Sequence, residues 1–247
     1  MVTVAPMQCW LPFTQPEVLS APPNGAEPWS GVRAIKPWGN PAEIGEVDTS
    51  MIIRIAEGQL QTRFGTFLEI LYYDGQKESI ALVMGNAEQG EDVLCRIHSH
   101  CLSAHVFNSI ECDCREQMEM AQALIEQKGS GVIIWLDQEG RGNGHLALVR
   151  SRSLQEQGLS QTVAYTTLGY EADARTYTRA AEILQDLGVK SVVLMSNSPQ
   201  KIDSLQAAGI NISGTQQLLL DPGANERLRR IYEDKIRQGH RMNFKPA

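Results

Sequence analysis

Three of the chain's five cysteines, Cys101, Cys112 and Cys114, lie within fourteen residues. Isolated cysteines usually pack in apolar cores, but here four of the five fall between Cys95 and Cys114. A Cys-x-Cys pair cannot close a disulfide on itself without severe strain, and this spacing is typical of metal ligands. Three thiolates leave one tetrahedral position of a zinc ion open, as in zinc sites that catalyse hydrolysis.

A glycine-rich segment, residues 139–144 (Glu-Gly-Arg-Gly-Asn-Gly), follows an apolar strand predicted over residues 131–136. Three glycines after a strand indicate a loop whose backbone approaches a ligand closely. An ordinary glycine turn is the alternative, because the segment has neither the lysine of a Walker loop nor the glycine order of a dinucleotide-binding loop.

Several basic residues lie at predicted strand ends or helix starts. Arginine guanidinium groups match phosphate oxygens, and a triphosphate needs several of them. Each one alone is more often a solvated surface charge, so the prediction depends on their convergence. Residues 196–201 also run from a strand into a helix N-terminus, which favours anions, although helix capping would explain the same serines. The candidates are Arg96, Arg141, Arg150, Arg152, Arg175 and Lys201.

Asp173 and Arg175 stand at the start of a helix predicted over residues 174–187. One interpretation is an N-cap, because a helix N-terminus favours a carboxylate. The other is an acid/base carboxylate beside an arginine that binds phosphate or acts as a nucleophile.

The elements that must position these residues change character along the chain. Alternating apolar residues predict strands over 51–55, 66–73, 80–84 and 93–97, and Asp74-Gly75 is a hairpin signal. In the last of these strands Cys95 alternates with Ile97, which favours a core position. The first half therefore predicts an antiparallel sheet.

The second half alternates helices with short apolar strands. Strands are predicted over 131–136 and 191–195, and the helix over 115–128 should stop at Gly129. A last polar helix over 224–238 is expected to be peripheral. The remaining helices are predicted over 146–157, 174–187 and 199–208. The fold class is α+β, with a mixed or antiparallel sheet first, and the site lies where the two halves meet.

The N-terminal segment differs from the rest. Eight of the eleven prolines lie in the first 41 residues, together with Trp10, Trp29 and Trp38. Proline disfavours regular helices and central strands, whereas tryptophans need burial. We therefore expect a proline-rich arm over residues 1–49 and a catalytic domain over 50–247.

Composition limits the partners. The chain has 247 residues, 42% of them hydrophobic, and a net charge of −7. The pI near 5.3 argues against binding nucleic acid. The sequence has no apolar run long enough to span a membrane and no leader-like start. We expect a cytoplasmic protein that acts on a small molecule.

At this point the ordered motifs resemble those of the GTP cyclohydrolase II family. The resemblance runs from about residue 93 to residue 214 and is specific because five motifs occur in order. They are Arg96-Ile-His-Ser-x-Cys101, Cys112-Asp-Cys114, Gln138-Glu-Gly-Arg141, Leu168-Gly-Tyr-x-Ala-Asp173-x-Arg175 and Asn197-x-Pro-x-Lys201.

The resemblance implies a cyclohydrolase II-like fold and hydrolytic opening of the imidazole ring of GTP at C8, with release of formate and pyrophosphate. It implies that Cys101, Cys112 and Cys114 bind one zinc ion and that Mg²⁺ accompanies the triphosphate. Asp173 matches the family's proton acceptor and Arg175 its nucleophile, although a phosphate clamp is as plausible for Arg175 because arginine is essentially always protonated. A homodimer is expected from the family. The positions that match substrate contacts are Arg96, Ile97, His98, Ser99, His100, Gln117, Glu139, Gly140, Arg141, Ser196 and Lys201.

Several positions depart from the family pattern, among them His145, which stands where the family has an apolar residue. His100 and His105 stand where the family has acidic residues, and Arg152 stands where it has a tyrosine tied to processing of the purine ring. Either histidine could serve as a fourth zinc ligand, which would close the metal site. The alternatives are therefore a divergent paralogue with a formylated or other product, or with another nucleotide or heterocycle, and a catalytically silent nucleotide-binding protein.

Overall fold

The computed structural model describes residues 52–196, 198–221 and 226–240, all within the unit Ile35–Ala247. The arm expected over residues 1–49, with its tryptophans, lies outside the described residues, as does Asn197 of the last motif. Among the helices of the described part, none is both long and apolar enough to cross a membrane.

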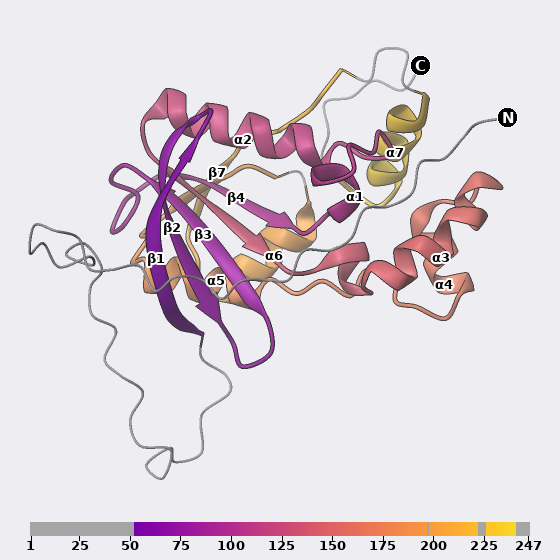
Figure 1. Ribbon diagram of the computed structural model, residues 1–247, viewed down its shortest axis with the longest axis horizontal. Helices are drawn as coiled ribbons and strands as arrows, with labels where there is room; N and C mark the ends of the chain where they lie inside the picture. The colour runs from indigo at the N-terminus through magenta and orange to yellow at the C-terminus, as the bar shows by residue number, and fades with distance from the viewer. Residues whose placement is uncertain (1–51, 197, 222–225, 241–247) are drawn as a thin grey trace, which may run out of the picture. The chain divides into compact units, whose positions relative to one another are not determined.

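A seven-stranded mixed sheet with the order β1-β2-β3-β5-β4-β6-β7 forms the centre of this unit (Figure 1). β1, β2, β3 and β5 pair antiparallel, whereas β5, β4, β6 and β7 pair parallel. The predicted α+β class with a mixed sheet is confirmed. The strands are β1 (Ile53–Thr62), β2 (Gly65–Tyr73), β3 (Glu78–Met84), β4 (Val93–Ser99), β5 (Gly131–Leu136), β6 (Val192–Leu194) and β7 (Ile212–Thr215).

The predicted hairpin between β2 and β3 is also confirmed. Asp74 Oδ1 accepts hydrogen bonds from the backbone N–H of Gln76 (2.8 Å) and of Lys77 (2.7 Å). Gly75 has a φ of +88°, a conformation that glycine adopts without strain. The turn residues therefore fix the register of the β2–β3 pair.

Helices cover both faces of the sheet. Ala121 and Ile125 of α2 pack against one face, in a cluster with Ile133, while Leu184 of α5 and Leu205 of α6 pack with the core on the other. Figure 1 shows α2 on the opposite side of the sheet from α5 and α6. The helices are α1 (Leu102–His105), α2 (Cys114–Lys128), α3 (His145–Glu156), α4 (Gln161–Thr167), α5 (Thr178–Asp186), α6 (Pro199–Ala207) and α7 (Glu226–Arg237).

The side chains of strand β4 point to both faces of the sheet. Cys95 and Ile97 lie in the core cluster that contains α5, as expected for Cys95. Because side chains alternate along a strand, Arg96 and His98 point to the other face, where α2 packs. β4 and β5 run parallel with Ser99 paired to Leu136, so the segments after both strands begin at the same edge of the sheet. Ligands commonly bind beyond the carboxyl ends of parallel strands.

The structure corrects several predicted boundaries. The helix predicted over 174–187 begins only at Thr178, and its N-cap is Tyr177, so the N-cap interpretation of Asp173 is wrong. Asp173 Oδ1 instead accepts a hydrogen bond from the backbone N–H of Arg175 (3.1 Å), which holds an irregular segment in place of a first helical turn. The sequence reading also missed α1, α4 and β7, which are short, and the far half of the exposed strand β1.

Candidate functional site

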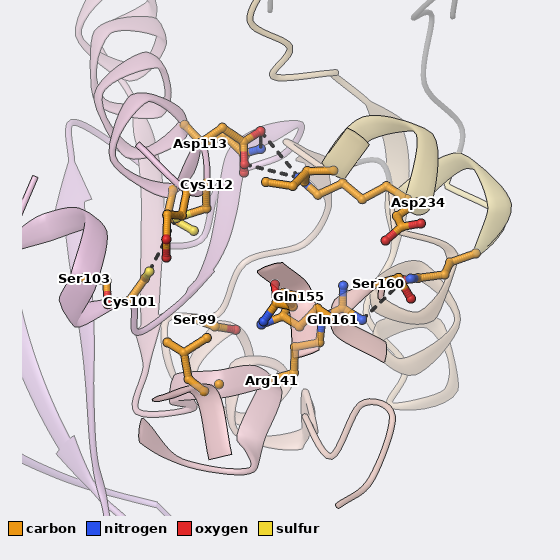
Figure 2. Close-up of a pocket in the computed structure, with 18 of the residues that line it drawn as sticks. Ser99, Cys101, Ser103, Cys112, Asp113, Arg141, Gln155, Ser160, Gln161 and Asp234 are labelled. Carbon is orange, nitrogen blue, oxygen red and sulfur yellow. Dashed lines mark hydrogen bonds and ion pairs between the residues drawn. The ribbon is translucent and has the colours of Figure 1, made fainter. Parts of the chain in front are cut away.

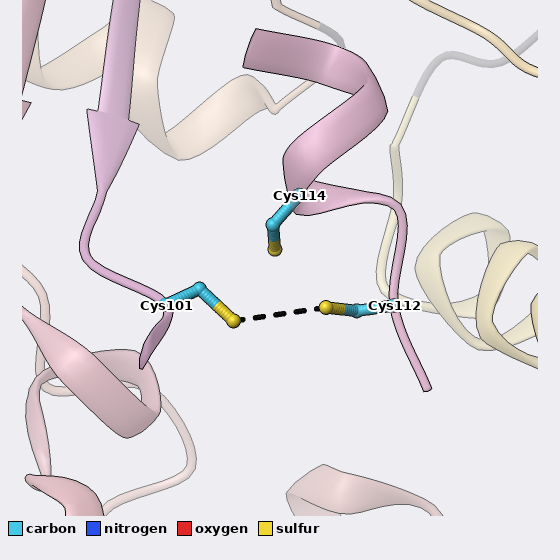
Figure 3. A group of neighbouring side chains, drawn as sticks. All are labelled: Cys101, Cys112 and Cys114. Atoms are coloured by element: carbon cyan, nitrogen blue, oxygen red, sulfur yellow. Dashed lines mark hydrogen bonds between the residues drawn. The ribbon is translucent and has the colours of Figure 1, made fainter. Parts of the chain in front are cut away.

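The three clustered cysteines converge. Cys101 follows β4, Cys112 lies in the loop before α2, and Cys114 is the first residue of α2. Their Sγ atoms all lie within 4.8 Å of one another, and those of Cys101 and Cys112 are 3.7 Å apart (Figure 3). His100 and His105 do not join this cluster. The geometry therefore does not favour either histidine as a fourth ligand of a metal ion bound by the three cysteines.

The electrostatics of the cluster suit a cation. Hydrogen bonds from Cys112 and Cys114 lower the pKa of the Cys101 thiol. The hydrogen bonds with Cys101 and Cys114 raise the pKa of the Cys112 thiol, and burial and the repulsion between neighbouring thiolates raise it further. A divalent cation removes that repulsion, and three soft sulfur donors are the set that zinc prefers. The residues present fit zinc.

The two histidines beside the cluster have other contacts. His100 Nδ1 lies 3.3 Å from Asp137 Oδ1, and its ring packs 5.1 Å from the Trp135 ring. The His105 ring lies 5.0 Å from that of His98, which is buried. Of the two, only His100 lines the cavity beside the cysteines, whereas His105 packs on His98.

A cavity of about 910 Å³ extends from the cysteines to α7 (Figure 2). Its walls include all three cysteines and most of the predicted substrate contacts. The predicted residues that line it are Arg96, His98, Ser99, His100, Gln117, Glu139, Gly140, Arg141, Arg175, Ser196 and Lys201. Three thiols that could hold a metal ion and cationic groups that are distant in sequence therefore share one cavity, which their spacing alone could not show.

Two predicted residues are not among those lining the cavity. The side chain of Ile97 is fully buried in the core, and its carbonyl oxygen accepts a hydrogen bond from Lys201 Nζ at 2.8 Å. Asp173 reaches the cavity through Arg175. Of the six basic candidates, Arg150 also lies outside the wall and stacks on Tyr170.

The glycine loop connects the metal site to the basic residues. Glu139 is 8% exposed, and its Oε2 accepts the backbone N–H of Leu102, next to Cys101, at 2.6 Å. Arg141 has a φ of +55°, which is costly for a side chain larger than glycine. Its Nη1 donates to Thr162 Oγ1 at 2.7 Å. The loop conformation thus holds a carboxylate toward the cysteines and a guanidinium toward α4.

Asp173 and Arg175 form a two-point ion pair. Arg175 Nε and Nη2 donate to the carboxylate at 2.8 and 2.5 Å. Burial opposes ionisation of Asp173, but the hydrogen bonds and charge of Arg175 lower the pKa of its carboxyl group. Burial likewise opposes the charge on Arg175, whose pKa Asp173 nevertheless raises. The backbone N–H of Ala174 donates to Arg141 O at 2.9 Å, which ties this pair to the glycine loop.

Lys201 is a buried cation, 6% exposed, with Nζ 5.6 Å from the centre of the Tyr177 ring. Burial, followed by the charges of Arg96 and Arg175, sets the pKa of Lys201 well below its usual value. An anion in the cavity would relieve both effects. Ser196, just before the helix, accepts the backbone N–H of Ser198 at 3.1 Å, whereas Ser198, the N-cap of α6, makes no side-chain capping bond.

The sequence reading missed one wall of the cavity. The helix expected to be peripheral, α7, lines the cavity with Asp234 and Lys235, and Gln238 just after it lines the cavity too. Gln238 Nε2 donates to Thr162 Oγ1 at 2.9 Å, so the chain just after α7 contacts α4. In the sequence, only the alternation of apolar and charged residues in α7 indicated that this helix packs against the rest of the domain.

The chain is similar in sequence to known proteins. A family model described as GTP cyclohydrolase II matches residues 53–217, so α7 lies beyond the matched segment. GTP cyclohydrolase-2 of Actinobacillus succinogenes is 41% identical over 176 residues, 70% of this chain and 80% of that protein. Riboflavin biosynthesis protein RibBA of Bacillus cereus is 42% identical over 198 residues, 79% of this chain.

The chain spans about half the length of the RibBA relatives it matches, 49% of the Bacillus cereus protein. Among solved structures, RibBX, a two domain 3,4-dihydroxy-2-butanone 4-phosphate synthase from A. baumannii, matches weakly. The TM-score is 0.39 at 21% sequence identity, over 69% of this chain and 41% of that one.

Proposed function

Because the chain belongs to the GTP cyclohydrolase II family, we propose that it hydrolyses the imidazole ring of GTP at C8 and releases formate and pyrophosphate. One observation carries the proposal: three thiols that could hold a metal ion and several buried basic side chains line a single cavity. Such a cavity is suited to a ligand with a hydrolysable ring at one end and phosphates at the other.

The three cysteines would hold one zinc ion. When bound, zinc supplies a Lewis acid that makes hydroxide available near neutral pH. Glu139 keeps this part of the site in place, because its carboxylate holds the backbone of Leu102 beside Cys101. A reducing compartment such as the cytoplasm would keep the thiols available as ligands.

The phosphate end would be bound by Arg141, Arg175 and Lys201. Arg175 stays protonated at any physiological pH, since Asp173 raises its pKa further. A guanidinium that cannot lose its proton is a poor nucleophile, so we assign Arg175 to phosphate binding. Mg²⁺ would accompany the triphosphate and share its charge.

Asp173 would orient Arg175. Both carboxylate oxygens of Asp173 accept hydrogen bonds from the guanidinium, and the pKa of its carboxyl group is low. A carboxylate so occupied is a weak base, which argues against a proton-acceptor role. The pair instead presents the remaining guanidinium donors in a fixed direction.

A second candidate, a divergent paralogue with another product or substrate, is favoured by the place of Arg152. Its Nη2 donates to Ser103 Oγ at 2.9 Å, and its Nε lies 3.6 Å from Glu111 Oε2. Ser103 and Glu111 flank the metal ligands in sequence, so Arg152 puts a positive charge next to the metal site. A product that keeps the formyl group would fit this change.

Product analysis tests both proposals. Zinc-loaded protein is incubated with Mg²⁺ and each of a panel of purine nucleotides, and the products are identified by mass spectrometry alongside assays for formate and pyrophosphate. We expect the diaminopyrimidine, formate and pyrophosphate from GTP. A formylated pyrimidine that Arg152→Tyr converts to the deformylated product would favour the second candidate, and no product from any nucleotide would exclude catalysis. Light scattering of the same sample tests the homodimer that we propose from the family.

A further inference from the structure

Asp113 lies between the metal-binding residues Cys112 and Cys114 and is almost completely buried. Its side chain is 3% exposed, and its two carboxylate oxygens lie 3.2 and 3.4 Å from Nζ of Lys235 in α7. Burial alone would raise the pKa of this carboxyl group, but the charge of Lys235 and hydrogen bonds from Lys235, Tyr232 and Gln117 lower it. A buried carboxylate without a cation would be costly, so α7 stabilises the charge at the metal loop.

From Asp113 a continuous set of hydrogen bonds runs to the substrate cavity. Gln117 Nε2 donates to Asp113 Oδ2 at 2.5 Å, and Gln117 Oε1 accepts from Arg96 Nη2. Arg96 Nη1 donates to Met195 O at 2.7 Å. The guanidinium of Arg96 is thus held from both sides at the wall of the cavity.

The direction of the Gln117 amide follows from the charges at its ends. A carboxylate accepts only, so it takes the NH₂ group, and a guanidinium donates only, so it requires the carbonyl oxygen. Without Lys235 the carboxylate of Asp113 would be held less firmly, and a Gln117 amide that then flipped would place NH₂ against the guanidinium and turn Arg96 away. The orientation of Arg96 therefore depends, through Gln117, on the ion pair between Asp113 and Lys235.

We propose that Lys235 is a positioning residue for the substrate site: its ion pair with Asp113 fixes the Gln117 amide, which holds Arg96 in place to bind an anionic part of the nucleotide. This inference rests on the proposed function for the identity of the ligand. Lys235 lies outside the segment matched by the family model, which ends at residue 217. Through the ion pair with Asp113, helix α7 is part of the substrate-binding site.

Removing the Lys235 charge should leave α7 docked. Tyr232 is fully buried and Leu228 is 7% exposed, and Tyr232 Oη accepts the backbone N–H of Leu220 at 3.1 Å. The Tyr232 ring also lies 5.3 Å from Lys235 Nζ, and its hydroxyl is hydrogen-bonded to Asp113, but the burial of Leu228 and the bond to Leu220 do not depend on the Lys235 charge. Lys235→Met is therefore a test of positioning, and Lys235→Arg keeps the charge.

The test compares Lys235→Met, Lys235→Arg and the control Lys190→Met. Lys190 forms an exposed ion pair with Glu91 at 3.4 Å, so the same substitution there removes only a solvated charge. For each protein we would measure zinc content, the Kd for GTP by calorimetry, and kcat and KM for formate release. Lys235→Met should raise the Kd and KM about tenfold, as expected for one hydrogen bond to a charged group. Its kcat should change less than about twofold, because binding lost equally from substrate and transition state changes KM alone.

Zinc content should stay at one per chain in all three variants, and Lys235→Arg should recover most of the affinity. In a Gln117→Leu background, Lys235→Met should add almost nothing, because the two residues act through one path. Unchanged GTP affinity in Lys235→Met, an equal effect in the Gln117→Leu background, or an equal effect of Lys190→Met would overturn the proposal.

The calorimetric readout separates this inference from the proposed reaction. A wild-type protein that binds GTP without releasing formate, and loses affinity in Lys235→Met, would contradict the reaction and support the positioning role. A protein that releases formate, and whose affinity for GTP is unchanged in Lys235→Met, would support the reaction and contradict the positioning role. Wild-type protein that binds no GTP would overturn both.

Discussion

The close approach of the glycine loop to residues 174–175 can be tested with a pair of glycine substitutions. Gly142 has a φ of +83°, and a Cβ there would lie 2.8 Å from the carbonyl carbon and oxygen of Ala174 and 3.0 Å from Arg175 N. Gly209 has nearly the same φ, +81°, but nothing within 4 Å of a Cβ. The two positions therefore share the backbone cost of alanine and differ in the clash.

The expected losses in the free energy of unfolding follow from the backbone cost and from the clash. A left-handed conformation costs an alanine about 1–2 kcal/mol, which is the expected loss for Gly209→Ala. Forcing atoms into a packed site adds about 1–3 kcal/mol, and backbone neighbours cannot turn away as a side chain could. Gly142→Ala should therefore lose about 2–5 kcal/mol in total, and each kcal/mol corresponds to about 2–4 °C in Tm for a chain of this size.

The clash should also change binding. The hydrogen bond from Ala174 N to Arg141 O (2.9 Å) sets the spacing of Arg141 and Arg175, so widening it should raise the KM for GTP. Urea unfolding and steady-state kinetics of both variants measure the two effects. Equal stability losses at Gly142 and Gly209, or a normal KM in Gly142→Ala, would refute the argument that this contact sets the spacing.

Three further predictions concern single contacts. Tyr72→Phe removes the hydrogen bond to Asp186 Oδ2 (2.6 Å) and should lower the free energy of unfolding by about 1 kcal/mol, measured by urea titration; no change would mean that water replaces the bond. The pKa of Asp173 is lowered in the folded state, so its contribution is present above the unfolded pKa of about 3.9 and is lost as pH falls further. Asp173→Asn should therefore be less stable than wild type by about 1–2 kcal/mol at pH 7 and by much less at pH 3, where a constant difference would contradict the ion pair with Arg175. Cys101→Ser should lose its zinc to a chelator at a concentration that leaves wild type loaded, as read by metal analysis, and equal retention would exclude Cys101 as a ligand.

Features set by local chemistry were predictable from the sequence. Asp74-Gly75 gave the hairpin because the turn is closed by neighbouring groups. The helix over 115–128 stops at Gly129, which has a φ of +76° as a C-cap glycine should. The cysteines converge because Cys112 and Cys114 flank a helix start and Cys101 follows a strand at the same edge.

Features set by distant contacts were not predictable. The pattern of residues 174–187 suits a helix, yet Asp173 and Arg175 bind each other and delay its start to Thr178. The polar composition of α7 gave no sign that Lys235 meets a carboxylate 122 positions away. A buried Lys201 bonded to Ile97 O likewise cannot be told from a surface lysine in sequence.

The central claim, that this cavity opens the ring of GTP at C8, is tested most directly with GTP labelled with ¹³C at that atom. Zinc-loaded protein and Mg²⁺ are added, and the label is followed by ¹³C NMR, with chelator-treated protein as the control. We expect the label to appear in free formate only with the zinc-loaded protein. Label that stays in the intact guanine ring, with zinc and GTP both bound, would contradict the proposed function.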